Sequence, residues 1–297
     1  MSLETFIITI YCHLCTALEV VVPGGNPRSR GFPPKLSDAE ALTMEFVGAF
    51  LGYHSDKAIW EYWRRHWAPW FPHLGDRSTF VRQLANLWQI KALLHQHWAG
   101  TLGAFEAPVH LVDGFPVPVC HPKRVSRHTV FRGEADWGFC ASKDQYYFGF
   151  HAMLLTTAEG VIAGVTLTAA SMDERDSVFD LPLERIRGAL LGDKGFIRPV
   201  LTEDLSGMGI ALHTPLRDNM RDSRPKSFVA QIVSVRRRIE TVIGQLAERF
   251  SMERNGARKL WPLVSRIYRK VAAHTLGVLI NKSLGRPLLE FEGLVTV

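Results

Sequence analysis

Cysteine is scarce in this sequence, with four residues among 297. So few do not form the dense framework of a small disulfide-stabilised secreted domain, which favours a reducing cytoplasm. Cys12 and Cys15 have the C-x-x-C spacing, but a zinc site would need a second such pair, and Cys120 and Cys140 do not form one. We therefore expect Cys12 and Cys15 to be buried thiols on one face of a helix.

The sequence also has no clean apolar run of the roughly 20 residues that span a bilayer. The N-terminal run from Phe6 to Val22 contains His13 and Glu19 and has no basic leader. A glycine-rich loop ending in Lys-Ser or Lys-Thr is missing as well, so no nucleotide cofactor is expected. These absences favour a cytoplasmic protein without a membrane partner.

The composition is that of a soluble globular protein, with 46% hydrophobic residues and a mean hydropathy of +0.00. The net charge of +6 is unevenly distributed. Residues 217–270 contain 14 Lys or Arg against 5 Asp or Glu. A positive field concentrated in one segment is compatible with a polyanionic partner such as DNA.

The first third of the sequence has the pattern of helices. Residues 3–22 are periodic, residues 23–34 read as a basic loop, and Ser37 with Glu40 has the capping-box spacing that opens a helix ending near Gly52. Four tryptophans then step by 3, 4 and 3 residues along one side of a further helix: Trp60, Trp63, Trp67 and Trp70. Such a stripe either stacks on bases or forms an aromatic core, and the core is the commoner arrangement.

The segment Asp76-Arg77-Ser78-Thr79 resembles an N-cap cluster, and Phe80, Leu84 and Leu87 give the following helix its buried side. Its other side carries Arg82, Gln83 and Asn86. This helix is either the DNA-binding helix of a helix-turn-helix, with Arg82 on DNA, or a solvated surface helix. We therefore expect residues 1–105 to form a helical N-terminal DNA-binding region.

From residue 106 the pattern changes to alternating strands and helices. A first strand is expected at 109–113, where Pro116 and Pro118 prevent its continuation as a central strand. An irregular stretch follows at 121–145, and the other expected elements are a hairpin of strands 145–156 and 161–168, short strands 189–192 and 210–214, and helices 177–188, 228–250 and 260–284. These elements predict an α/β mixed-sheet domain with flanking helices over residues 106–297.

Three carboxylates stand at positions suited to phosphoryl transfer. Asp113 and Asp193 each end an apolar run, and Glu240 lies on an expected helix face behind Arg236 and Arg237. Two divalent ions held by such acids activate an oxygen nucleophile and stabilise the leaving oxygen. The arginines would grip phosphates of the scissile strand, although a simple i,i+4 ion pair on the helix is the alternative.

Other candidate sites are weaker. The histidines His110, His121 and His128 fit no common zinc spacing. Asp173 and Asp176 are read as surface turn residues rather than extra ligands. Lys194 follows an acid, so it either touches phosphate or is a solvated lysine.

The stretches Leu111–Gly114, Leu191–Phe196 and Arg236–Val242 resemble the three acidic motifs of the DDE transposases of bacterial insertion sequences, in particular insertion sequence family nine hundred and eighty-two. The resemblance also covers the segments Tyr146–His151 and Leu167–Asp173. It implies an RNase H-like core, Asp113, Asp193 and Glu240 as ligands of two Mg²⁺ or Mn²⁺ ions, and metal-dependent cleavage and strand transfer. It further implies terminal inverted repeats and target DNA as partners, and a homodimer as the working unit.

Two positions depart from the Tyr, Arg, Glu, Lys signature of related transposases. Arg236 fits its arginine, but Val233 stands at the tyrosine position and Ala247 at the lysine position. The sequence leaves two other functions open. One is a catalytically silent DNA-binding protein derived from a transposase, and the other is a stand-alone RNase H-like nuclease.

Overall fold

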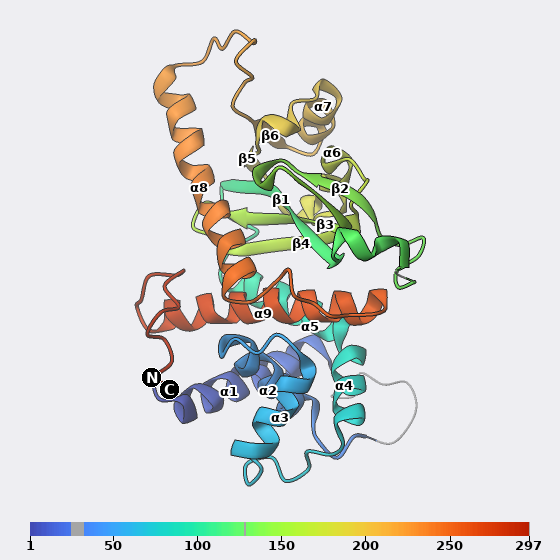
Figure 1. Cartoon of the computed structure of the whole chain (residues 1–297). Helices are drawn as coiled ribbons and strands as arrows, with labels where there is room; N and C mark the ends of the chain where they lie inside the picture. Colours follow the sequence, from blue (N-terminus) through green and yellow to red (C-terminus); the bar gives the residue numbers. More distant parts are fainter. Residues whose placement is uncertain (25–32, 128, 297) are drawn as a thin grey trace. The chain divides into compact units, whose positions relative to one another are not determined.

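The structure is a computed structural model that describes residues 1–24, 33–127 and 129–296. Residues 25–32 of the expected basic loop, and His128, lie outside the described residues. The chain forms two compact units. Met1–Trp98 and Leu246–Val297 form one, here called the helical unit, and Ala99–Gln245 form the other, the sheet unit (Figure 1). The helical unit thus contains both ends of the chain, whereas the sequence predicts a single domain boundary, after residue 105.

Several helices of the helical unit begin at a serine whose side chain caps the first turn, at Ser2, Ser37 and Ser55. The helices of this unit are α1 (Leu3–Val21), α2 (Asp38–Phe50), α3 (Asp56–His66), α4 (Arg77–Asn86), α5 (Trp88–Thr101) and α9 (Leu260–Ser283). Ser37 and Glu40 form the expected capping box at the start of α2. Among the described residues, α1 is the one helix long and apolar enough to cross a membrane, and it buries Phe6, Ile10 and Leu14 in this unit. Cys12 on the same helix is exposed, so its expected burial is wrong.

The tryptophan stripe does not lie on one helix, because α3 ends at His66. Trp63 is fully buried and donates from Nε1 to the carbonyl oxygen of Met44 at 2.9 Å. The rings of Trp63 and Trp67 lie 6.0 Å apart, while Trp70 remains 44% exposed. The aromatic-core alternative is therefore confirmed at Trp63.

Helix α4 differs from the expected second helix of a helix-turn-helix in two ways. The segment between α3 and α4 runs from Trp67 to Asp76, which is longer than the three- or four-residue turn of that motif. Gln83, expected on the exposed side, is buried and donates to the Leu36 carbonyl oxygen and to Asp38 Oδ1. Arg82 is exposed, as expected.

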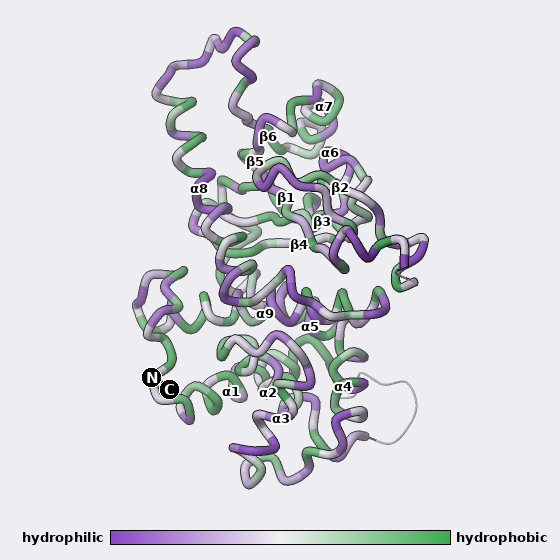
Figure 2. Tube along the Cα trace, in the orientation of Figure 1, coloured by the Kyte–Doolittle hydropathy of each residue, from purple (hydrophilic) through white to green (hydrophobic). Residues whose placement is uncertain are grey.

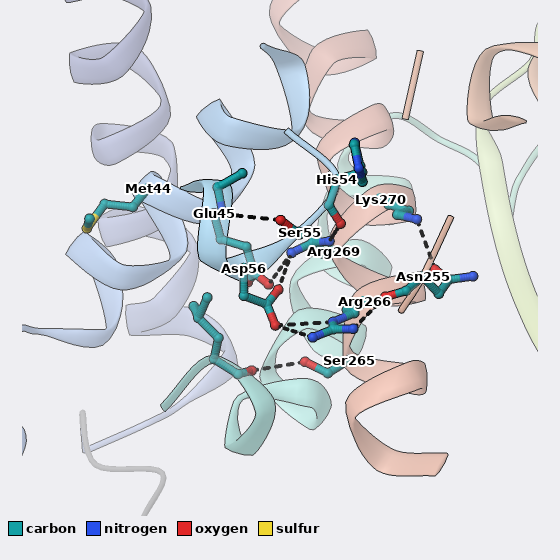
Figure 3. Close-up of polar contacts among 12 residues, drawn as sticks. Met44, Glu45, His54, Ser55, Asp56, Asn255, Ser265, Arg266, Arg269 and Lys270 are labelled. Atoms are coloured by element: carbon teal, nitrogen blue, oxygen red, sulfur yellow. Dashed lines mark hydrogen bonds and ion pairs between the residues drawn. The ribbon is translucent and has the colours of Figure 1, made fainter. Parts of the chain in front are cut away.

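A buried network of charges joins α2, α3, α5 and α9, and the sequence did not predict it. Figure 3 shows the part of this network around Asp56, Arg266 and Arg269. Lys91 donates to Glu45 at 2.8 Å, and both side chains are buried. Arg269 donates to Asp56 at 2.8 Å, and Arg266 also pairs with Asp56. Burial raises the pKa of Asp56, but the two arginines outweigh it and lower that pKa to about 2. Each of these buried charges is thus paired with a side chain of opposite charge.

The sheet unit is built on six strands: β1 (Val109–Cys120), β2 (Asp136–Cys140), β3 (Gln145–Thr157), β4 (Ile162–Ala169), β5 (Gly188–Leu191) and β6 (Ile210–His213). The order is β2-β3-β1-β5-β6, and β4 also pairs with β3. Strand β3 is antiparallel to its neighbours β1 and β4, while β5 and β6 run parallel to β1. This arrangement confirms the expected mixed sheet. Helices α6 (Glu174–Ser177), α7 (Pro199–Gly207) and α8 (Lys226–Glu248) complete the α/β fold.

Three expectations for the sheet unit are wrong. Strand β2 lies within residues 121–145, a stretch that was expected to be irregular. Strand β1 continues through Pro116 and Pro118 because β5 pairs with it only as far as Leu111. Beyond that residue one edge of β1 has no ladder that a proline would break. The helix expected at 177–188 is replaced by the end of α6 and two short 3₁₀ turns, Val178–Asp180 and Leu183–Arg185. Pro182 between the turns lacks the N–H that a continuous helix needs.

Candidate active site

Sheet register brings Asp113 and Asp193 to the same place. Leu111 of β1 lies opposite Leu191 of the parallel strand β5. Each aspartate follows its leucine by two residues, so both carboxylates leave the sheet at the end of the β1–β5 ladder. Asp113 continues in β1, and Asp193 precedes the 3₁₀ turn Lys194–Phe196. The convergence of these two acids therefore follows from local strand pairing.

Helix α8 adds Arg236 between the two aspartates. The helix is amphipathic, with hydrophobic and hydrophilic residues alternating along it (Figure 2), and it buries Ile232, Ile239 and Val242. Arg236 lies on this buried side and is 8% exposed. Its guanidinium donates from Nη2 to Asp113 Oδ2 and from Nη1 to Asp193 Oδ1, at 3.4 Å each.

Glu240 lies one helical turn beyond Arg236 on α8. Its side chain is exposed, and it has no hydrogen bond or ion pair within the described part of the chain. Across residues 1–24, 33–127 and 129–296, no three His, Cys, Asp or Glu side chains are close enough to hold a metal ion. The structure therefore joins the two aspartates through Arg236 and leaves Glu240 beside them on the helix, outside direct contact.

The electrostatics of Asp113 reflect its burial at this site. Burial raises its pKa to about 6, against the opposing effects of the Arg236 charge and the Gly114 N–H, which donates to Asp113 Oδ1 at 2.9 Å. The negative charges of Asp193 and Glu174 raise it further. A positive charge added near Asp113 would therefore favour its ionised form and lower its pKa.

The chemistry of this donor set fits a hard divalent cation. Mg²⁺ and Mn²⁺ prefer carboxylate oxygens and often take one or two protein carboxylates each. Asp113 and Asp193 supply such oxygens, and the shared guanidinium of Arg236 shows that the pair already attracts one positive charge.

Three residues near Asp113 were not predicted as part of the site. Tyr147 Oη and His151 Nδ1 are 3.2 Å apart, and His151 Nε2 lies 3.1 Å from Glu174 Oε1 at ion-pair distance, without hydrogen-bond geometry. A Cβ at Gly114 would come within 2.1 Å of His151 Nε2. Gly114 thus leaves space for the imidazole on the face of β1 opposite to that of the Asp113 side chain. The glycine that follows Asp113 in the sequence indicates a close approach at this position, but it does not identify His151 as the residue that approaches.

The remaining candidates have identifiable contacts. Lys194 pairs with Asp218 at 3.2 Å, and Arg237 is exposed on α8. Asp173 caps α6 and pairs with Arg175, and Asp176 pairs with Arg198 at 2.6 Å. Asp173 therefore lies at the start of α6 and Asp176 within it, rather than in the surface turn that was expected. Arg82 belongs to the helical unit, where it lines a surface groove together with Arg77 and Arg266.

Comparison with known proteins found one matching family model and one similar solved structure. Residues 104–260 match the family model described as a transposase DDE domain. Among solved structures, the chain is similar to "Cryo-EM structure of piggyBac transposase synaptic complex with hairpin DNA (SNHP)", with 10% sequence identity and a TM-score of 0.46 over 98% of this chain and 77% of that chain. No curated protein matches the sequence.

Proposed function

Because the chain belongs to the transposase DDE domain family, we propose that it cleaves DNA at the ends of an insertion sequence and joins those ends to target DNA. The proposed ligands of two divalent ions are Asp113, Asp193 and Glu240. The observation that carries this proposal is the convergence of the two aspartates in the sheet unit, with Arg236 donating to both. A bacterial element of insertion sequence family nine hundred and eighty-two type is the proposed source.

Bound Mg²⁺ or Mn²⁺ would activate the attacking oxygen and stabilise charge on the leaving oxygen. The chain's own residues fix where these ions bind. Asp113 and Asp193 are held rigidly because both follow paired strand residues in register. Glu240 on α8 is exposed, which leaves its carboxylate free to turn toward an ion that draws the three acids together.

DNA binding is proposed for both units. In the sheet unit, Arg236, Arg237 and Lys194 lie on or next to the segments that carry the acids, and they would contact phosphates of the strand being cut. In the helical unit, exposed Arg82 on α4 would contact the terminal inverted repeats. Two element ends must be handled together, so a homodimer is the proposed working unit, in the bacterial cytoplasm.

Cleavage and joining of labelled duplexes that carry the element's terminal inverted repeats test this function. The parent protein is expected to nick the ends and join them to target DNA with Mg²⁺ or Mn²⁺, and to do neither with EDTA. Asp113→Asn and Asp193→Asn should each abolish both steps while end binding persists. Asp204→Asn, an exposed acid on α7, is the matched control and should retain activity.

The alternatives give different results in the same assay. Specific end binding with no cleavage by the parent, with either ion, would support a silent DNA-binding protein. Metal-dependent cleavage without any joining would support a stand-alone nuclease.

A further inference from the structure

Strands β2 and β3 form a two-stranded ribbon whose two faces differ. In the antiparallel register, Trp137 lies opposite Phe148 and Phe139 opposite Tyr146. Directly opposed residues point to the same face of a sheet, and residues two apart along a strand share that face. Trp137, Phe139, Tyr146 and Phe148 therefore lie together, and we call these four side chains the aromatic platform.

The opposite face of the ribbon is packed against the rest of the sheet unit. A Cβ at Gly138 would come within 2.8 Å of the Ala170 Cβ and of the Tyr147 ring. Tyr147 is buried there and contacts His151, which lies beside Gly114. This face of the ribbon is thus packed, and Tyr147 on it connects the ribbon to His151 and Gly114.

The aromatic platform itself is open. Trp137 is 43% exposed, Phe139 51% and Tyr146 65%. The rings are already ordered in pairs, with centroids 5.7 Å apart for Trp137 and Phe148 and 5.0 Å apart for Phe139 and Tyr146. Large exposed aromatic side chains gathered on one rigid surface usually mark a binding site.

Basic residues occur in the segments next to the platform. Residues 121–148 contain five Lys or Arg and three Asp or Glu. Burial raises the pKa of the Cys120 thiol, and the nearby positive charge of Arg124 opposes this rise. Cys120 is paired with Phe148 of the platform. Arg132 follows Phe131, whose ring packs 5.4 Å from Phe150 at the buried end of this face. One of the acids, Asp136, is occupied by a hydrogen bond with Ser171.

We propose that the aromatic platform binds unpaired bases of a DNA strand, which stack on Trp137 and Tyr146 while Arg124 and Arg132 contact the strand's phosphates. Aromatic faces accept any base, and a positive rim follows the backbone, which are the two elements of a single-strand binding surface. This inference rests on the proposed function, because the strand opened next to the cut is the one the platform would hold. Two platform residues, Tyr146 and Phe148, lie on β3, the strand that also carries His151.

Fluorescence anisotropy with two labelled DNAs of the same sequence tests the proposal. One DNA is a terminal-repeat duplex with a single-stranded extension, and the other is fully paired. Trp137→Ala and Tyr146→Ser should each weaken binding of the extended DNA about tenfold and leave binding of the paired duplex within about twofold. Trp137→Phe, which keeps a stacking ring, should restore most of the affinity. Trp70→Ala, at a tryptophan exposed to a similar degree in the helical unit, is the matched control.

Equal losses on both DNAs, or no loss on the extended DNA, would overturn the proposal. A platform that instead contacts a second copy of the chain would show itself in sedimentation, as dissociation of the parent oligomer in the Trp137→Ala variant, and this would also overturn it. The proposed function fails separately. If the parent binds the extended DNA through the platform but never joins DNA, the platform stands and the transposase activity does not.

Discussion

Arg236 of α8 donates a hydrogen bond of 3.4 Å to Asp113 in the middle of β1, although the two residues are 123 positions apart in the sequence. The other terminal nitrogen of the same guanidinium donates to Asp193. One buried cation is therefore shared by two acids whose proposed role is to hold metal ions. From this relationship we infer that Arg236 stabilises the metal-free site and competes with a divalent ion for the same oxygens.

Arg236→Gln should therefore have opposite effects with and without metal. In EDTA the variant should lose about 1–3 kcal/mol of unfolding free energy, because two carboxylates lose their charged partner. Its affinity for Mn²⁺ should rise on the order of tenfold, because the ion no longer displaces a guanidinium. Urea unfolding and calorimetric Mn²⁺ titration measure the two effects.

Arg237→Gln is the control for this variant, because Arg237 is the exposed neighbour on the same helix. It should change neither quantity appreciably. Weaker Mn²⁺ binding by Arg236→Gln than by the parent would contradict competition between the arginine and the ion.

The pKa of Asp113 predicts how stability depends on pH. Its folded-state value of about 6 lies above the ordinary 3.8. The contribution of this carboxyl to stability is thus fully present below about 3.8 and is lost as the pH rises through about 6. Asp113→Asn mimics the neutral acid, so without metal it should be more stable than the parent by about 1–3 kcal/mol at pH 8 and equal to it near pH 4. Denaturant unfolding at both pH values checks this, and a less stable variant at pH 8 would refute it.

Gly114→Ala tests whether His151 needs the space that Gly114 leaves. The added methyl group would collide with the imidazole and should cost about 1–3 kcal/mol of unfolding free energy. Gly244→Ala on α8 is the matched control. Its Cβ would meet nothing within 4 Å, so it should be neutral or stabilise the helix by up to about 1 kcal/mol. Similar thermal stability of the two variants would show that His151 gives way freely.

The predictable part of this fold was the part governed by local pattern. The capping box at Ser37 and the long periodic helices α8 and α9 were expected within a few residues. The hairpin of β3 and β4 was equally clear, because its two apolar runs flank a glycine-bearing turn. The convergence of Asp113 and Asp193 was predicted only through motif resemblance. Its physical cause, the opposition of Leu111 and Leu191, is a tertiary register that the sequence does not display.

What could not be predicted depended on partners remote in sequence. The sequence predicts that Pro116 ends β1, but β5 pairs with β1 only as far as Leu111, so the proline breaks no hydrogen bond to β5. Glu174 and His151 meet across the sheet unit, and neither carries a local signal of the other. The buried pair of Lys91 and Glu45 reads as two ordinary helix-surface charges in the sequence, because only the packing of α2 and α5 removes water from them.

This buried pair gives a prediction for the helical unit. Lys91→Met should cost about 3–5 kcal/mol of unfolding free energy, because it removes one of the two cations that pair with the buried Glu45. Combining it with Glu45→Leu should recover much of the loss, since an apolar pair needs no compensation. Lys57→Met breaks the exposed pair of Lys57 and Glu61 and should change stability by less than about 1 kcal/mol. Urea unfolding of the variants measures these values, and additive losses in the double variant would contradict the account.

Glu240 is the most direct test of the proposed active site, because it is the proposed ligand that touches neither aspartate in the structure. We would compare Mg²⁺-dependent joining of labelled element ends by the parent, by Glu240→Gln and by Glu248→Gln, the last at an exposed acid on the same helix. The account predicts that Glu240→Gln binds the ends but joins none, while Glu248→Gln joins them like the parent. Joining by Glu240→Gln at the parent's rate would contradict the assignment of Asp113, Asp193 and Glu240 to one catalytic site.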